Sequence, residues 1–205
     1  MSIQRIPYSN GDVYEGESDC KKNGQGKMIY SDRTVYQGEW KDDKRNGQGK
    51  MTSIKGNYEG EWNDDYRHGQ GKKYYSNGEY QGGWAHDKRN GQGIMRYKNG
   101  FIYEGEWKDD KRDGQGKLTD KNGTVYEGEL KDDKRDGQGK QTYGDDGRIY
   151  EGQWKYNKRY GQGKLTIKIA MFMFMKATLM ISVTVKENKH TQMEVFMKVN
   201  GKIIK

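Results

Sequence analysis

The chain has 205 residues, of which 33% are charged and only 30% hydrophobic, a balance that alone is typical of disordered proteins. Its 12% of aromatic residues argue against disorder, and the single cysteine, Cys20, excludes a framework of intrachain disulfides. No run of about 18 apolar residues is present to cross a membrane, and the first residues lack the apolar segment of a signal peptide. We therefore expect a folded protein in the reducing cytoplasm.

A repeated motif follows a half-unit that begins at Tyr8. Tyr-x-Gly recurs with spacings of 22 to 24 residues, starting at Tyr14, Tyr36, Tyr58, Tyr80, Tyr103, Tyr126 and Tyr150. A Gly-Gln-Gly follows each copy, starting at Gly24, Gly47, Gly69, Gly91, Gly114, Gly137 and Gly161. Seven copies in phase predict a repeat architecture over residues 8–166.

Each unit has the alternation of a β-strand. Side chains of a strand point alternately to its two faces, so Tyr36, Gly38 and Trp40 share one face, while Gln37 and Glu39 share the other. Glycine weakens a strand unless another group approaches closely. We expect each of these glycines to make room for a neighbouring aromatic ring.

Turn signals divide every unit into two strands. The polar segment 41–46 is turn-prone, and we expect the return strand to begin at Gly47. Asn-Gly at 99–100 and at 122–123 predicts a tight hairpin into the next unit. The pattern therefore predicts an all-β fold, an antiparallel β-hairpin repeat array that forms a single-layer meander or solenoid. Its exposed sheet ends could support self-association.

The unit YEGEWKDDKRDGQGKLT, residues 103–119, resembles the MORN (membrane occupation and recognition nexus) repeat. Ser18 and Leu130 depart from the aromatic residue that is usual at their position. The resemblance implies a binding module, since such arrays occur in membrane-junction, ciliary and cytoskeletal scaffolds and beside the catalytic domains of lipid kinases. It implies a non-catalytic scaffold for protein partners, associated with cytoskeleton or membrane. A regulatory array detached from a lipid kinase, without kinase activity of its own, remains an alternative.

The aromatic face is the first candidate site. Its rings have a structural role, and surface left over between them could bind an extended peptide or a helix of a partner protein. The candidate partner groove consists of Tyr36, Trp40, Tyr58, Trp62, Tyr80, Trp84, Tyr103 and Trp107.

A row of basic residues is the second candidate site. Its members recur in register: Lys44, Arg45, Lys88, Arg89, Lys111, Arg112, Lys134, Arg135, Lys158 and Arg159. Stacked cations could bind an anionic phospholipid surface, including phosphoinositides. Asp pairs run beside them, as at 42–43 and 132–133, so a mutually neutralised, solvated edge is the other interpretation.

No constellation for catalysis is apparent. His68, His86 and His190 stand at unrelated positions of their segments, and Cys20 has no base near it in its unit. Gly-Gln-Gly-Lys is not followed by the Ser or Thr and the helix that a phosphate-binding loop requires. We expect no enzymatic activity, no cofactor and no metal. The net charge of +3 over residues 1–166 also gives no reason to expect nucleic-acid binding.

The composition changes at residue 167. Residues 167–205 hold six of the ten Met residues, no Tyr or Trp, and a net charge of +5. A shift of the reading frame by one base turns Met-Phe into Val, Met-Lys into Glu and Met-Glu into Gly, whichever codons are used. If the Phe codons are TTT and the Lys codons AAG, two Tyr-Glu-Gly runs then return 22 codons apart. We expect this atypical tail to be a frame-shifted reading of further repeats; a lysine-rich amphipathic tail that contacts membrane is the alternative.

Overall fold

The computed structural model describes residues 2–170, 178–187, 193–199 and 202–204, with side chains over 3–167. Within these ranges all regular secondary structure is β-strand. The chain divides into two compact units, which are described separately. The N-terminal unit comprises Met1–Asn99 and Trp107–Lys111, and the C-terminal unit comprises Gly100–Glu106 and Arg112–Lys205.

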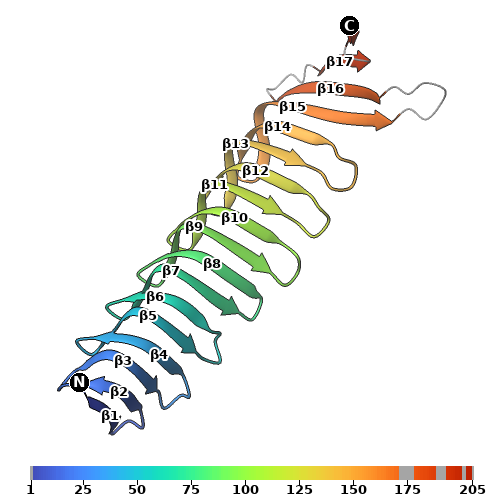
Figure 1. The fold of residues 1–205 in the computed structure, drawn as a ribbon. Helices are drawn as coiled ribbons and strands as arrows, with labels where there is room; N and C mark the ends of the chain where they lie inside the picture. Colours follow the sequence, from blue (N-terminus) through green and yellow to red (C-terminus); the bar gives the residue numbers. More distant parts are fainter. Residues whose placement is uncertain (1, 171–177, 188–192, 200–201, 205) are drawn as a thin grey trace. The chain divides into compact units, whose positions relative to one another are not determined.

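In the N-terminal unit each strand pairs antiparallel with the next along the chain, as Figure 1 shows. The strands are β1 (Ser2–Pro7), β2 (Val13–Ser18), β3 (Lys22–Ile29), β4 (Val35–Lys41), β5 (Lys44–Thr52), β6 (Tyr58–Asn63), β7 (Tyr66–Tyr75), β8 (Gly78–Ala85) and β9 (Lys88–Tyr97). This meander confirms the all-β, antiparallel hairpin array that the repeat predicts.

The C-terminal unit has the same arrangement from β11 onward. Its strands are β11 (Lys111–Thr119), β12 (Val125–Lys131), β13 (Lys134–Thr142), β14 (Ile149–Lys155), β15 (Lys158–Ala170), β16 (Thr178–Glu187), β17 (Met193–Val199) and β18 (Lys202–Ile204). Strand β10 (Ile102–Lys108) contributes residues to both units. Strands β16 to β18 lie in the atypical tail, where a frame-shifted origin stays a prediction.

The turn inside each repeat is tighter than we expected. The segment 41–46 is not a loop, because β4 continues to Lys41 and β5 begins at Lys44. Asp42 and Asp43 alone make the turn, with φ of 48° and 67°. Two left-handed residues form the hairpin turn that matches strand twist, and Asp tolerates this conformation better than most residues. Five later turns repeat the geometry, the last with Tyr156 and Asn157.

A bulge follows each Tyr-x-Gly. The register of β4 against β5 shifts between Gly38 and Trp40. The carboxylate of Glu39 accepts a hydrogen bond from the backbone N–H of Gln48 at 2.8 Å, beside this irregularity. Glu61, Glu106 and Glu129 bind the corresponding N–H groups of their own repeats at 2.7 to 3.0 Å. The outward-facing glutamate therefore satisfies a backbone donor next to the bulge.

The core is a ladder of rings laid on glycines. Tyr58 is fully buried and Trp62 is 4% exposed, and their rings meet edge to face with centroids 5.2 Å apart, so they share a face as predicted. A Cβ on Gly71 would lie within 2.6 Å of the Tyr58 ring, so this glycine makes room for the tyrosine. A Cβ on Gly60 would first meet the backbone of the facing strand, at Gly71. The Tyr58 hydroxyl donates to the Glu61 carbonyl at 2.9 Å.

Candidate functional site

The rings of the candidate partner groove form the core of the array. Their exposed fractions lie between 0% and 5% for Tyr36, Trp40, Tyr58, Trp62, Tyr80, Trp84, Tyr103 and Trp107. A ligand on this face would therefore meet the side chains that lie over the rings more than the rings themselves. A partner groove at these positions stays a prediction. In such a groove the rings would form the floor.

Arginines of the basic row cover this floor. The Arg45 guanidinium lies 4.3 Å from the ring centroid of Trp62, a tryptophan of the next repeat. Arg89 lies 4.0 Å from Trp107, and Arg135 lies 4.3 Å from Trp154. The second residue of each Lys-Arg pair is therefore on the aromatic face of its strand, not in an outer loop. Cation–π contact and burial of the arginine stem both follow from this position.

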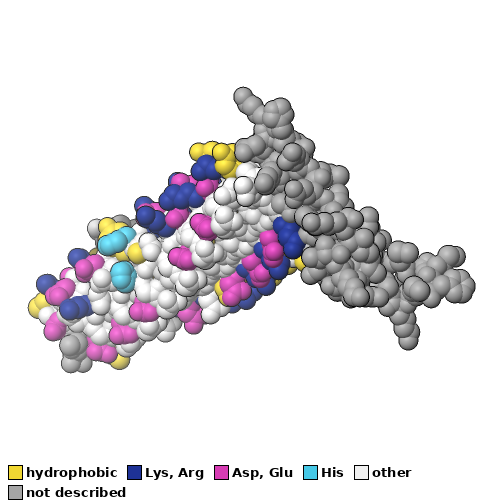
Figure 2. Space-filling view, turned by 90° about the horizontal axis from the view of Figure 1, so that it is seen from above, with side chains coloured by type: hydrophobic (Ala, Val, Ile, Leu, Met, Phe, Trp, Pro, Cys, Tyr) yellow, Lys and Arg dark blue, Asp and Glu magenta, His cyan; other side chains and the backbone are white. Residues whose placement is uncertain are grey.

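Each of these arginines is also held by the following turn. Arg45 Nε donates to Asp65 Oδ1 at 3.0 Å, and the same oxygen accepts the Arg45 backbone N–H at 3.0 Å. Arg89 and Arg112 make the same contacts with Asp110 and Asp133. Acidic and basic side chains lie interleaved in the same bands (Figure 2). The arginines of the row are therefore neutralised by neighbouring aspartates, which is one of the two interpretations that the sequence allows.

The lysines of the row are more exposed. Lys44 pairs with Asp64 at 3.4 Å, and Lys88 pairs with Asp109 at 3.3 Å, each across to the next repeat. Lys111 and Lys158 begin β11 and β15.

The last turn breaks the pattern. Tyr156 and Asn157 replace the Asp pair, so the backbone N–H of Arg135 binds the Asn157 amide oxygen at 2.8 Å instead of a carboxylate. Burial lowers the pKa of Arg135. The Lys134 ammonium lies 5.4 Å from the Tyr156 ring centroid, and Arg159 lies 4.5 Å from that of Tyr150.

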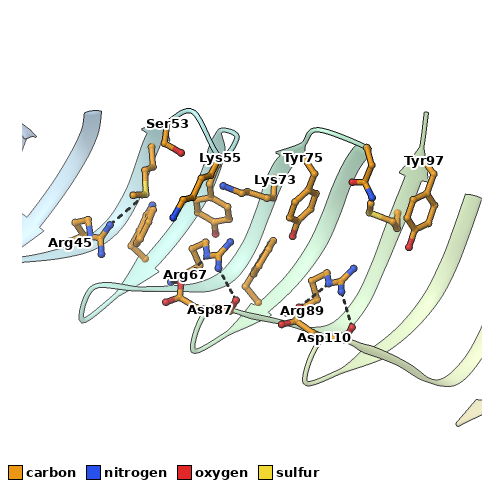
Figure 3. Close-up of a pocket in the computed structure, with 16 residues that line it drawn as sticks. Arg45, Ser53, Lys55, Arg67, Lys73, Tyr75, Asp87, Arg89, Tyr97 and Asp110 are labelled. Carbon is orange, nitrogen blue, oxygen red and sulfur yellow. Dashed lines mark hydrogen bonds and ion pairs between the residues drawn. The ribbon is translucent and has the colours of Figure 1, made fainter. Parts of the chain in front are cut away.

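A hollow of about 740 Å³ opens over the ladder in the N-terminal unit (Figure 3). We call it the central hollow. Its lining is Arg45, Met51, Ser53, Lys55, Tyr58, Trp62, Arg67, Lys73, Tyr75, Asn77, Trp84, Asp87, Arg89, Met95, Tyr97 and Asp110. The hollow brings Tyr58, Trp62 and Trp84 of the aromatic candidate site together with Arg45 and Arg89 of the basic row.

Sequence reasoning missed several of these residues. Arg67 takes the place of Arg45 in its repeat, but it follows Tyr66 instead of a lysine and so escapes the Lys-Arg pattern. Lys73 stands two positions after Gly71, where Met51 and Met95 stand in the adjacent repeats. The signal was present in the alignment of the units: one lysine in a column of mostly apolar residues.

No cluster that could hold a metal ion appears among the described residues. Nowhere in that part of the chain are three His, Cys, Asp or Glu side chains placed so that they could hold a metal ion. His68 and His86 lie with ring centroids 6.1 Å apart, whereas His190 lies outside the described residues. The described segments also contain no helix long and apolar enough to span a membrane.

Comparison with known proteins supports one assignment. A search of curated proteins found no match. A family model described as the MORN repeat matches seven consecutive segments, residues 14–35, 36–57, 58–79, 80–101, 103–125, 126–148 and 150–168. These segments are the structural hairpin units, and together they cover most of the chain. The chain therefore belongs to the MORN-repeat family.

Proposed function

We propose that this protein is a non-catalytic scaffold that binds a protein partner through the central hollow. The hollow is the observation that carries the proposal. It combines a floor of buried rings with walls of Tyr75, Tyr97 and Met51 and a rim of arginines. Large aromatic and arginine side chains are the residues that contribute most to protein interfaces.

Two features make the hollow suitable for a segment of another protein. Its floor is rigid, because the rings are locked by edge-to-face contacts and by hydroxyl-to-carbonyl hydrogen bonds. A preformed surface loses little conformational entropy on binding. We place such a scaffold in the cytoplasm, at cytoskeleton or membrane, by analogy with the family; that location and self-association through sheet ends remain predictions.

Capture from a cell extract with a matched variant tests the proposal. Asn77 is an exposed residue of the lining, so Asn77→Trp should fill the hollow and leave the core intact. We expect a partner that the wild-type chain retains and the variant loses. A partner retained equally by both chains would show that binding lies elsewhere on the array. The far-ultraviolet circular dichroism of the variant should equal that of wild type.

A second candidate function, binding of an anionic phospholipid surface, is favoured by the last turn. There Lys134 and Arg135 face Tyr156 and Asn157 in place of carboxylates, and the Tyr156 side chain is exposed. Tyrosine beside lysine suits a membrane interface. Sedimentation with vesicles, with and without a phosphoinositide, tests this. Replacing Tyr156 and Asn157 by Asp, as in the earlier turns, should abolish salt-sensitive binding; unchanged binding would exclude this turn.

A further inference from the structure

The positive charge of the central hollow comes from two lysines. Three arginines line it, and each is paired with an aspartate of the next turn: Arg45 with Asp65, Arg67 with Asp87 and Arg89 with Asp110. No acidic partner within hydrogen-bonding distance accompanies Lys55 or Lys73 among the described residues. The lining therefore carries two lysine charges in addition to its paired arginines; Asp32, outside the lining, acts electrostatically on Lys55.

Lys73 occupies a core-facing position. Met28 and Met95, at the same place in their repeats, are 5% and 3% exposed. The Lys73 ammonium donates to the carbonyl of Gly56 at 3.0 Å, which brings it to the turn that carries Lys55. Figure 3 shows Lys73 extending from its strand toward Lys55. One carbonyl satisfies one of the three donors of an ammonium group.

The surroundings of Lys73 disfavour its charge. Burial lowers the pKa of Lys73, and the nearby Arg67 lowers it further. An anionic ligand would offset both effects. Arg67 and Arg89 add donors on the same side, because Nε and one amino group of each guanidinium bind aspartate while the other amino group has no protein partner in the described residues.

Two other hollows lined by described residues do not share this excess. The corresponding hollow of the C-terminal unit, about 390 Å³, balances Arg112 and Arg135 against Asp120 and Asp133. A hollow at the start of the N-terminal unit contains Lys22 against three aspartates. Among these three hollows, the basic subsite is found only where Lys55 and Lys73 contribute.

We propose that the central hollow binds an acidic peptide segment of a partner protein, with a carboxylate on Lys73 and apolar side chains against Tyr75, Tyr97 and Met51. This inference rests on the proposed scaffold function. Charge complementarity selects the carboxylate, and the aromatic and methionine walls select apolar neighbours. Lys73 lies partly buried in the hollow and the exposed Lys55 also lines it, whereas lysines outside it, such as Lys44 and Lys88, are paired with aspartates. This placement favours a peptide over a flat bilayer.

Selection from a random-peptide library displayed on phage tests the inference on the full chain. Lys73→Met places the side chain of the neighbouring repeats in this position, so it should not impair folding. Lys72→Met is the matched control, because it removes the same charge from the opposite face of the same strand. We expect the wild-type chain to enrich peptides rich in Asp and Glu beside apolar residues. In fluorescence anisotropy, Lys73→Met should weaken their binding about tenfold, ~1.4 kcal/mol, whereas Lys72→Met should have little effect.

Each other outcome has a defined meaning. Enriched peptides without acidic residues, or equal affinity for wild type and Lys73→Met, would overturn the acidic-peptide inference but leave the scaffold function in place. No enrichment by wild type over Asn77→Trp would contradict both. Vesicles of phosphatidylcholine and phosphatidylserine that sediment wild type but not Lys73→Met would assign the subsite to a membrane and overturn the peptide as its ligand.

Discussion

Single glycines decide whether the tyrosine ladder can form. Gly116 faces the Tyr103 ring, and a Cβ at this position would lie 2.5 Å from a ring carbon. The ring is fully buried and its hydroxyl is bonded to the Glu106 carbonyl at 2.7 Å, so it has little room to move. The repeated glycine is thus a steric requirement of the neighbouring tyrosine.

Gly116→Ala should lower the free energy of unfolding by about 2–3 kcal/mol, because the added methyl group overpacks the ladder. Gly123→Ala is the control. Gly123 has φ of +79° but nothing closer than 3.9 Å to its added Cβ, so only left-handed strain of about 1 kcal/mol is expected. Urea unfolding followed by tryptophan fluorescence measures both. Equal losses would contradict the steric role of the Tyr103 ring, because Gly116, unlike Gly123, has no left-handed φ that alanine would strain.

Some of these residue roles can be predicted from the sequence and others cannot. Alternation alone places Tyr36 and Trp40 on one face, and seven glycines in one position indicate close approach there. The contact of Arg45 with Trp62 and Asp65 could not be predicted, because it depends on the register between two repeats and on the two-residue turn. The hollow was missed for the same reason: its lining comes from side chains far apart in sequence that meet only once the hairpins are stacked.

At the scale of the hairpin, the turn of one repeat forms hydrogen bonds with an arginine of the previous repeat, and we call this set of bonds the clamp. The backbone N–H of Asp87 donates to the Arg67 carbonyl at 3.2 Å, and Asp87 Oδ1 accepts from both the backbone N–H and Nε of Arg67. The clamp extends the hydrogen bonding between repeats beyond the paired strands. The last turn keeps the backbone part of the clamp with Asn157, so an amide oxygen can accept the bond from the arginine backbone N–H.

Asp87→Ala should therefore destabilise the protein by about 2 kcal/mol, since two donors of Arg67 lose their acceptor and alanine is less tolerant of a left-handed turn. Asp87→Asn should cost less than about 1 kcal/mol, because it removes a half-exposed charge and preserves the acceptor. Urea unfolding again provides the measurement. If the two variants lose the same stability, the charge of Asp87 and not its hydrogen bonds would be the stabilising factor.

At the scale of the whole chain, the boundary of the repeats is a question for the nucleotide sequence. The family match ends at residue 168, close to the composition change. A one-base slip near codon 166 requires specific codons downstream: TTT for Phe174, so that the shifted frame reads Tyr, and AAG for Lys176, so that it reads Gly. Sequencing the transcript checks this. TTC or AAA at these codons, in an intact frame, would contradict the frame-shift hypothesis.

The tyrosine ladder should also make the whole molecule sensitive to alkali. Burial raises the pKa of Tyr14 and of Tyr126 to about 12, and burial raises the pKa of Tyr36, Tyr58 and Tyr103 as well. In the unfolded chain a tyrosine titrates near pH ~10. Because the folded-state pKa is the higher one, this stabilisation is complete below pH ~10 and is lost as the pH rises through the folded-state values.

We therefore expect the free energy of unfolding to fall steeply above pH ~10. Tyrosinate absorbance should increase over the same pH range in which the circular dichroism signal is lost, because the buried phenols ionise when the repeats open. Tyr126→Phe should reduce the pH dependence of the free energy of unfolding by the contribution of one buried tyrosine. Tyr156→Phe is the control, because Tyr156 is exposed. Tyrosinate absorbance that develops fully while the circular dichroism stays native would contradict the expectation, because it would mean that the phenols of the ladder reach solvent without unfolding.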